Sequence, residues 1–145
     1  MATPTKAQLA QARGLLDRAT ARFNGAAAAI ARSNPTEGEF DNHFDGVVTG
    51  IFHAVDAFEL VTTGLRREVR EAEQATRIRS VIAALERDRI ARLPAAARLI
   101  DLNRRRNTSF HGEWLEVLDV DALEDAISAG GQLLAAVRAA LAKRC

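Results

Sequence analysis

Cysteine is almost absent from this chain of 145 residues, since the only one, Cys145, is the last residue. A single thiol cannot form a disulfide within one chain, and it cannot supply the thiolate set of a zinc or iron–sulfur site. The sequence also has no His-Glu-x-x-His pattern and no clustered pair of aspartates. We therefore expect no metal and no other cofactor, and the lone thiol fits a reducing compartment.

Long apolar runs are also missing. No stretch approaches about 18 apolar residues without a charge, the length at which a membrane-spanning helix is expected. The first residues read MATPTKAQ and do not give the charged start and apolar segment of a secretion signal. We therefore expect a cytoplasmic protein with no membrane partner.

Tyrosine is absent, aromatic residues make up only 5% of the chain, and there are three prolines. Apolar residues nevertheless reach 48%, and alanine and leucine dominate them, which suits helices far better than strands. A chain of this length forms one domain that buries roughly 70% of its unfolded surface. The composition predicts a single all-α domain over residues 1–145, a compact bundle of four to five helices.

The first two helices are predicted by end signals and apolar spacing. Thr3-Pro4 and a capping box from Thr5 to Gln8 begin the first, and Asn34-Pro35 ends it. Its core positions repeat every seven residues: Leu9, Leu16, Phe23 and Ile30, with Ala12, Ala19 and Ala26. The second helix runs from Thr36 to Gly64, and its apolar face comprises Phe40, Phe44, Val47, Val48, Ile51, Val55 and Phe58. Gly46 and Gly50 flank that face and favour a close helix crossing, with a ligand surface as the alternative.

Three further helices complete the prediction. One covers residues 66–93, with Val69, Ile78, Val81, Ile82, Leu85 and Leu93 inward. The next starts at Pro94 and carries Leu99 and Leu102 inward. The last opens with Asp121 and Glu124, is weakened midway by Gly130-Gly131, and uses Leu123, Ile127, Leu134, Val137 and Leu141.

The net charge of +1 hides an uneven distribution of charge along the chain. Residues 64–106 carry 12 arginines against 6 acidic residues, while the flanking segments are net acidic. This basic third is where a polyanion is expected to bind. The alternative is that these arginines cover solvated helix faces, with local pairs such as Glu73 and Arg77.

The segment from Asp101 to Gly112 reads DLNRRRNTSFHG and holds the strongest candidate for chemistry. Arg106 and His111 are separated by four residues, and Asn107 directly follows the arginine. An arginine supplies a fixed fork of donors for a phosphate, and an imidazole exchanges a proton near neutral pH. Arg106 lies seven residues after Leu99 and four after Leu102, so a continuous helix would turn it towards a buried or interface side, where a guanidinium needs an anion or a partner.

Arg106, Asn107, His111 and Gly112 in a small helical chain resemble the HEPN family, whose signature is an arginine, a polar residue and then a histidine. The resemblance implies a HEPN-like bundle that forms a homodimer, so that two copies of the motif share a cleft. It also implies a metal-independent endoribonuclease with a toxin or phage-defence role. A neutralising antitoxin or a nucleotidyltransferase is the implied protein partner.

The resemblance also implies the reaction and the role of each residue. The 2′-hydroxyl of RNA would attack the neighbouring phosphorus and leave a 2′,3′-cyclic phosphate, a route that DNA lacks. His111 would act as general base or acid, Arg106 would hold the phosphate, and Asn107 would orient the histidine or the substrate. Arg104 and Arg105 would assist in binding the RNA.

Two features of the motif leave alternatives open. Some family toxins carry a tyrosine that a partner modifies two residues after the histidine, and this chain has Glu113 there, which also places a negative charge beside the site. Residues five apart on a helix differ by about 140° in direction, so Arg106 and His111 meet only if the helix ends between them, if the long arginine reaches around, or if they come from different subunits. A non-catalytic helical module that binds RNA or protein is the alternative function, and a small regulatory bundle is a third.

Overall fold

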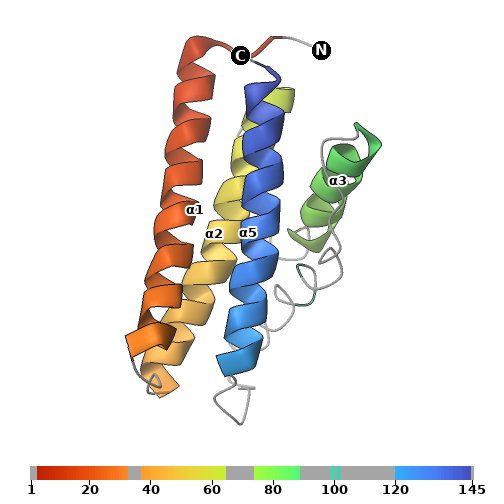
Figure 1. Ribbon diagram of the computed structural model, residues 1–145. Helices are drawn as coiled ribbons and strands as arrows, with labels where there is room; N and C mark the ends of the chain where they lie inside the picture. Colours follow the sequence, from red (N-terminus) through yellow and green to blue (C-terminus); the bar gives the residue numbers. More distant parts are fainter. Residues whose placement is uncertain are drawn as a thin grey trace.

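The computed structural model describes residues 3–32, 37–64, 74–88, 99, 101 and 120–144 (Figure 1). Its helices are α1 (Lys6–Arg32), α2 (Glu37–Thr63), α3 (Gln74–Arg87) and α5 (Val120–Ala142). Leu99 and Asp101 are also helical. Within these ranges the regular structure is all α-helix, which confirms the predicted fold class as a helical bundle. The described helices include none that is both long and apolar enough to cross a bilayer.

Three long helices form the body of the bundle. Helix α1 runs antiparallel to α2 and α5, which are parallel to each other, and α3 lies to one side (Figure 1). The most extensive packing joins α1 to α2, and α5 packs on both. The shorter α3 packs less extensively, on α2 and α5. The start of α1 and the end of α5 therefore lie at the same end of the bundle.

The start of α1 and the end of α2 are joined by specific hydrogen bonds. The capping box is confirmed, because the Thr5 amide donates to Oε1 of Gln8 at 2.9 Å and the Gln8 amide donates to Oγ1 of Thr5 at 3.1 Å. Gly64 terminates α2 with a φ of 75°, and its amide donates to the Leu60 carbonyl at 3.0 Å. Nε2 of Gln8 then donates to the Gly64 carbonyl at 3.4 Å. One side chain thus caps α1 and links it to α2.

The core lies where the apolar spacing predicts it. All the described predicted positions of α1 and α2 are buried except Leu9 and Ile30, which pack against the edge of the core. In α3 the buried predicted residues are Ile78, Val81, Ile82 and Leu85. Val69 and Leu93 lie outside the described residues, as do Asn34-Pro35, and the side chain of Phe40 also does. The heptad spacing of α1 therefore gives a buried seam, as expected for two helices in close contact.

Helix α5 buries a wider stripe than the sequence predicts. Leu123, Val137 and Leu141 are buried, whereas Ile127 and Leu134 are only partly buried. Leu133 is fully buried at 0% exposure. Because α5 packs against α1 on one side and against α2 and α3 on another, its inward arc also takes in alanines that carry little weight in an apolar pattern: Ala126, Ala129, Ala136 and Ala140.

The ring of Phe23 on α1 lies against glycines of both α2 and α5. A Cβ atom built on Gly50 of α2 would lie 2.8 Å from Cε1 of that ring, and one built on Gly130 of α5 would lie 2.7 Å from Cζ. On the same side of α2, the Arg22 side chain lies over Gly46. The predicted helix crossing at Gly46 and Gly50 is thus confirmed. Gly130 and Gly131 do not interrupt α5, and the first of them makes room for the ring.

Alanine substitutions at Gly130 and Gly131 should have opposite effects on stability. Gly130→Ala forces a methyl group into the buried ring of Phe23 and should lower the free energy of unfolding by about 1–3 kcal/mol. Gly131→Ala meets nothing within 4 Å and should raise it by about 0.4–1 kcal/mol, because alanine restricts the unfolded chain. Urea denaturation of both variants measures the difference. Adding Phe23→Leu to Gly130→Ala should cost less than the sum of the two changes, and strict additivity would contradict this packing.

Candidate functional site

The motif predicted to carry chemistry lies outside the described residues, and this applies to Arg104, Arg105, Arg106, Asn107 and His111. The structure does describe its approach. Leu99 is fully buried and belongs to the hydrophobic core, which confirms its predicted inward orientation. Asp101 is helical and partly buried. Leu99 and Asp101, five and three residues before Arg104, are therefore helical, and Leu99 is anchored in the core.

A nearly buried ion-pair cluster joins α2 to α3. Nη2 of Arg77 donates to Oδ1 of Asp56 at 2.6 Å, and Nε of Arg77 donates to Oε1 of Glu59 at 2.7 Å. The exposed fractions of the three side chains are 10% for Arg77, 15% for Asp56 and 14% for Glu59. Asp56 and Glu59 are three residues apart on α2, so both point to the same side of the helix. The guanidinium lies against two carboxylates and holds α3 on α2.

Charge and burial act in opposite directions on Arg77. Burial lowers its pKa, but the hydrogen bonds to Asp56 and Glu59, together with their negative charges, raise the pKa of the guanidinium by more. Arg77 therefore keeps its proton, and its donors are directed at protein carboxylates. It is a structural cation, although it belongs to the basic third of the sequence.

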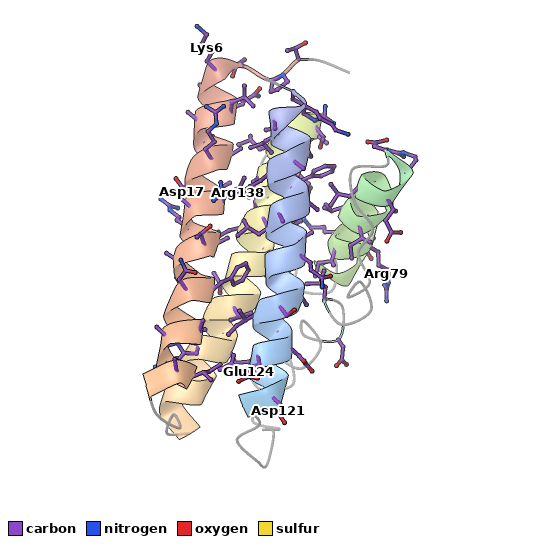
Figure 2. All side chains as sticks on the ribbon, viewed as in Figure 1. Lys6, Asp17, Arg79, Asp121, Glu124 and Arg138 are labelled. Atoms are coloured by element: carbon purple, nitrogen blue, oxygen red, sulfur yellow. The ribbon has the colours of Figure 1, made fainter. Side chains whose placement is uncertain are left out.

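The other described arginines of that basic third are Arg79 and Arg87. Arg87 forms an exposed pair with Asp88 at 3.3 Å. Arg79 is exposed and points away from the bundle on the outer side of α3 (Figure 2). The described arginines of residues 64–106 are thus exposed to solvent or paired with acidic residues. This agrees better with solvated helix faces than with a single surface that binds a polyanion. Glu73, the predicted local partner of Arg77, lies outside the described residues.

A second polar cluster spans α1 and α5. Arg138 donates through Nη2 to Oδ1 of Asp17 at 3.3 Å and to Oγ1 of Thr20 at 3.0 Å. Figure 2 shows Arg138 between the two helices with Asp17 beside it on α1. The Thr20 hydroxyl in turn donates to the Leu16 carbonyl at 3.0 Å. Thr20 therefore uses its hydroxyl both as donor and as acceptor, and it positions the guanidinium.

A shallow pocket of about 180 Å³ opens beside this cluster. It is lined by Arg13, Leu16, Arg138, Leu141 and Ala142. Leu16 and Leu141 are buried and give it an apolar floor, while the two arginines supply positive charge. Its lining suits a small anionic group.

The described histidines, His43 and His53, both lie on α2 and are partly buried. His53 interacts with another residue of the protein. In the described ranges, no three histidine, cysteine or acidic side chains gather closely enough to hold a metal ion.

These observations define the class of the chain as an all-α bundle with buried apolar helix contacts and two interhelical ion-pair clusters. No family model, curated protein or solved structure matches the chain. The function is therefore argued from its own residues.

Sequence reasoning missed both interhelical clusters. A signal for the first was present, because Asp56 and Glu59 stand one turn apart among the apolar residues of α2, next to Val55 and Phe58. Because an unpaired buried charge is costly, two acidic residues at the border of an apolar face indicate that a cation from a neighbouring helix pairs with them. The second cluster has no comparable signal, since Asp17 and Arg138 are ordinary exposed residues until their helices are placed side by side.

Proposed function

We propose that this chain is a metal-independent endoribonuclease of HEPN type, with Arg106 and His111 as its catalytic pair. The observation that carries the proposal is the sequence Arg106-Asn107-Thr-Ser-Phe-His111-Gly112 within an all-helical chain. The burial of Leu99 supports it, because it ties the approach to the motif into the bundle. A catalytic pair needs such a rigid support.

The chemistry follows from the two side chains and the ribose. His111 removes the proton of the 2′-hydroxyl, whose oxygen attacks the adjacent phosphorus. The bond from phosphorus to the 5′-oxygen breaks, the 5′-oxygen takes up a proton, and a 2′,3′-cyclic phosphate remains. Arg106 stabilises the charge on the phosphate oxygens, and Asn107 orients the histidine or the substrate. Arg104 and Arg105 bind the flanking RNA, and neither a metal nor a cofactor takes part.

The proposal includes an assembly and a setting. Two chains form a homodimer in which Arg106 of one subunit lies near His111 of the other, which removes the difficulty of their helical spacing. The enzyme acts in the cytoplasm as a toxin or phage-defence nuclease. It is restrained there by an antitoxin or by a nucleotidyltransferase-type partner. Such a partner cannot restrain the enzyme by modifying a tyrosine of this chain, because the chain has none.

A non-catalytic helical module that binds RNA or protein is the second candidate. Glu113 favours it, because a carboxylate next to His111 repels the substrate phosphate. The pairing of Arg77 with two carboxylates favours the protein-binding form of this module, because it removes one arginine from the set available for RNA.

Cleavage in the presence of EDTA separates the two candidates. We expect the purified protein to cut a labelled RNA strand and to leave the all-deoxy strand of the same sequence intact. The new 3′ ends should resist alkaline phosphatase until mild acid opens the cyclic phosphate. Intact RNA at high protein concentration, together with measurable RNA binding, would establish the non-catalytic module instead.

A further inference from the structure

The pocket between α1 and α5 combines a positioned guanidinium with unused donors. Arg138 donates from Nη2 to Thr20 and Asp17, and its Nε and Nη1 atoms make no hydrogen bond within the described part of the chain. Thr20 holds Nη2 of the guanidinium at 3.0 Å, and the N–H groups of Nε and Nη1 lie on different edges of it, each able to donate to one acceptor. A bidentate contact with two phosphate oxygens uses Nη2 together with Nε or Nη1, so it can form when the contact between Nη2 and Asp17 is given up.

The carboxylate beside Arg138 is weakly held. The contact between Arg138 and Asp17 is 3.3 Å long, and the exposed fractions of the two side chains are 43% and 76%. Exposed pairs of this kind contribute little, so an anion with more acceptor oxygens can replace Asp17. Arg13 lies one turn before Asp17 on α1, interacts with another residue of the protein, and also lines the pocket. Two arginines therefore line a pocket that has one exposed carboxylate at its side.

The charged residues at the ends of α1 and α5 support an anion at this position. Lys6, Lys143 and Arg144 lie at the end of the bundle formed by the start of α1 and the end of α5. Asp121 and Glu124 lie towards the opposite end of α5 (Figure 2). This separation of charge attracts a polyanion to the end near the pocket. Lys143 and Arg144 also complement the dipole of α5, and the pocket lies beside the last turn of that helix, so the dipole does not by itself favour an anion there.

The volume of the pocket indicates whether it encloses a whole small ligand or only one group of a larger one. Pockets that enclose a free small ligand measure roughly 300–1,000 Å³. At about 180 Å³ this pocket accepts a single group. We infer that Arg13 and Arg138 bind one backbone phosphate of a single RNA strand, with the apolar floor of Leu16 and Leu141 against the sugar. This subsite rests on the proposed function, because it names RNA as the occupant, and it holds the strand at a place other than the motif.

Binding of a 2′-O-methyl RNA strand tests the subsite without cleavage. Fluorescence anisotropy of the labelled strand should show Arg13→Gln and Arg138→Gln each weakening binding by about tenfold. Each variant should also lower the slope of log K against log salt by about one. Arg18→Gln is the matched control, because it removes an exposed charge of the same helix outside the pocket, and it should change affinity less than about twofold. Thermal melting checks that the variants remain folded.

The opposite change supplies an independent check. Asp17→Asn removes the competing carboxylate and should strengthen RNA binding by about two- to fivefold, whereas Glu124→Gln at the far end of α5 should leave it unchanged. Equal effects of Asp17→Asn and Glu124→Gln would mean that general charge attracts the strand, and the subsite would be refuted.

Inorganic phosphate distinguishes the two sources of the anion. If millimolar phosphate perturbs the amide NMR signals around Arg138 while both glutamine variants bind RNA as the wild type does, the pocket takes free phosphate and the inference fails. Measuring RNA cleavage distinguishes failure of the subsite from failure of the proposed function. A wild type and glutamine variants that bind and cut RNA equally well leave the proposed function standing without this subsite. Binding that depends on both arginines without any cleavage leaves the subsite standing alone.

Discussion

Replacing His111 by alanine is expected to slow RNA cleavage by about 10²–10⁴-fold, the usual contribution of a general acid or base. The imidazole moves a proton and contributes little to holding the strand, so affinity for an uncleavable RNA should stay within a few fold. Single-turnover rates at saturating protein separate the two effects. His43→Ala is the matched control, since His43 is a partly buried histidine on α2 outside the motif, and it should leave the rate within about twofold.

The proposed dimer makes a sharper test possible. Arg106→Ala and His111→Ala should each be inactive, and mixing them should restore activity if the catalytic pair forms between subunits. Random exchange makes half of the dimers mixed, and each of those carries one intact site, so about a quarter of the wild-type activity is expected. No recovery after verified subunit exchange would mean that each pair forms within one chain. A histidine variant that cuts as fast as the wild type would remove the ribonuclease proposal altogether.

Much of the fold could be predicted because its signals are local. The reciprocal hydrogen bonds between Thr5 and Gln8 require only a threonine and a glutamine three residues apart. The seam of α1 follows from a seven-residue repeat, and Gly64 ends α2 with the positive φ that glycine adopts without strain. Each of these features is determined by residues within one or two helical turns.

The features that could not be predicted depend on how one helix meets another. Arg77 has its partners on α2, 18 and 21 residues earlier, whereas the sequence suggested a neighbour on its own helix. Leu133 is fully buried because α5 has neighbours on two sides, and Gly130 is needed because the ring of Phe23 approaches it. The spacing of apolar residues predicts which face of a helix is buried. It does not predict which residues of another helix lie against that face.

The candidate site likewise has a part that could be predicted from the sequence and a part that could not. The resemblance of the Arg106 to His111 segment to the HEPN signature was sufficient to formulate a reaction. They do not determine whether the two side chains converge, because this depends on where the helix ends and on a second subunit. The pocket with Arg13 and Arg138 could not be predicted, because its residues from α1 and its residues from α5 are more than 120 positions apart in the chain.

Replacing Arg77 by alanine is expected to release α3 from the bundle. The substitution removes the guanidinium that Asp56 and Glu59, at 15% and 14% exposure, share, and breaking such a nearly buried pair costs about 3 kcal/mol. Because α3 packs less extensively than the other helices, this cost should appear first in its own docking. Amide hydrogen exchange across Gln74–Arg87 should accelerate by about 100-fold or more, while exchange in α1 and α2 changes far less.

Three further variants show that lost charge compensation is the cause. Arg79→Ala shortens an exposed arginine two residues away and should change stability by less than about 0.5 kcal/mol. Changing Arg77 to Met together with Asp56→Asn and Glu59→Gln removes all three charges and should recover most of the loss, because no carboxylate is then left without its cation. A triple variant as unstable as Arg77→Ala would instead show that packing of the arginine stem holds α3 in place.

The pH dependence of this contribution follows from the raised pKa of Arg77. Burial opposes the charge and the two carboxylates favour it by more, so the folded-state pKa lies above the ordinary arginine value. A group with a raised pKa stabilises the fold fully below its unfolded pKa and loses that effect only as pH rises through the folded value. The difference between the wild type and Arg77→Ala should therefore stay constant from neutral pH to about pH 10. A difference that shrinks within this alkaline range would show that a group other than the guanidinium holds α3 on α2.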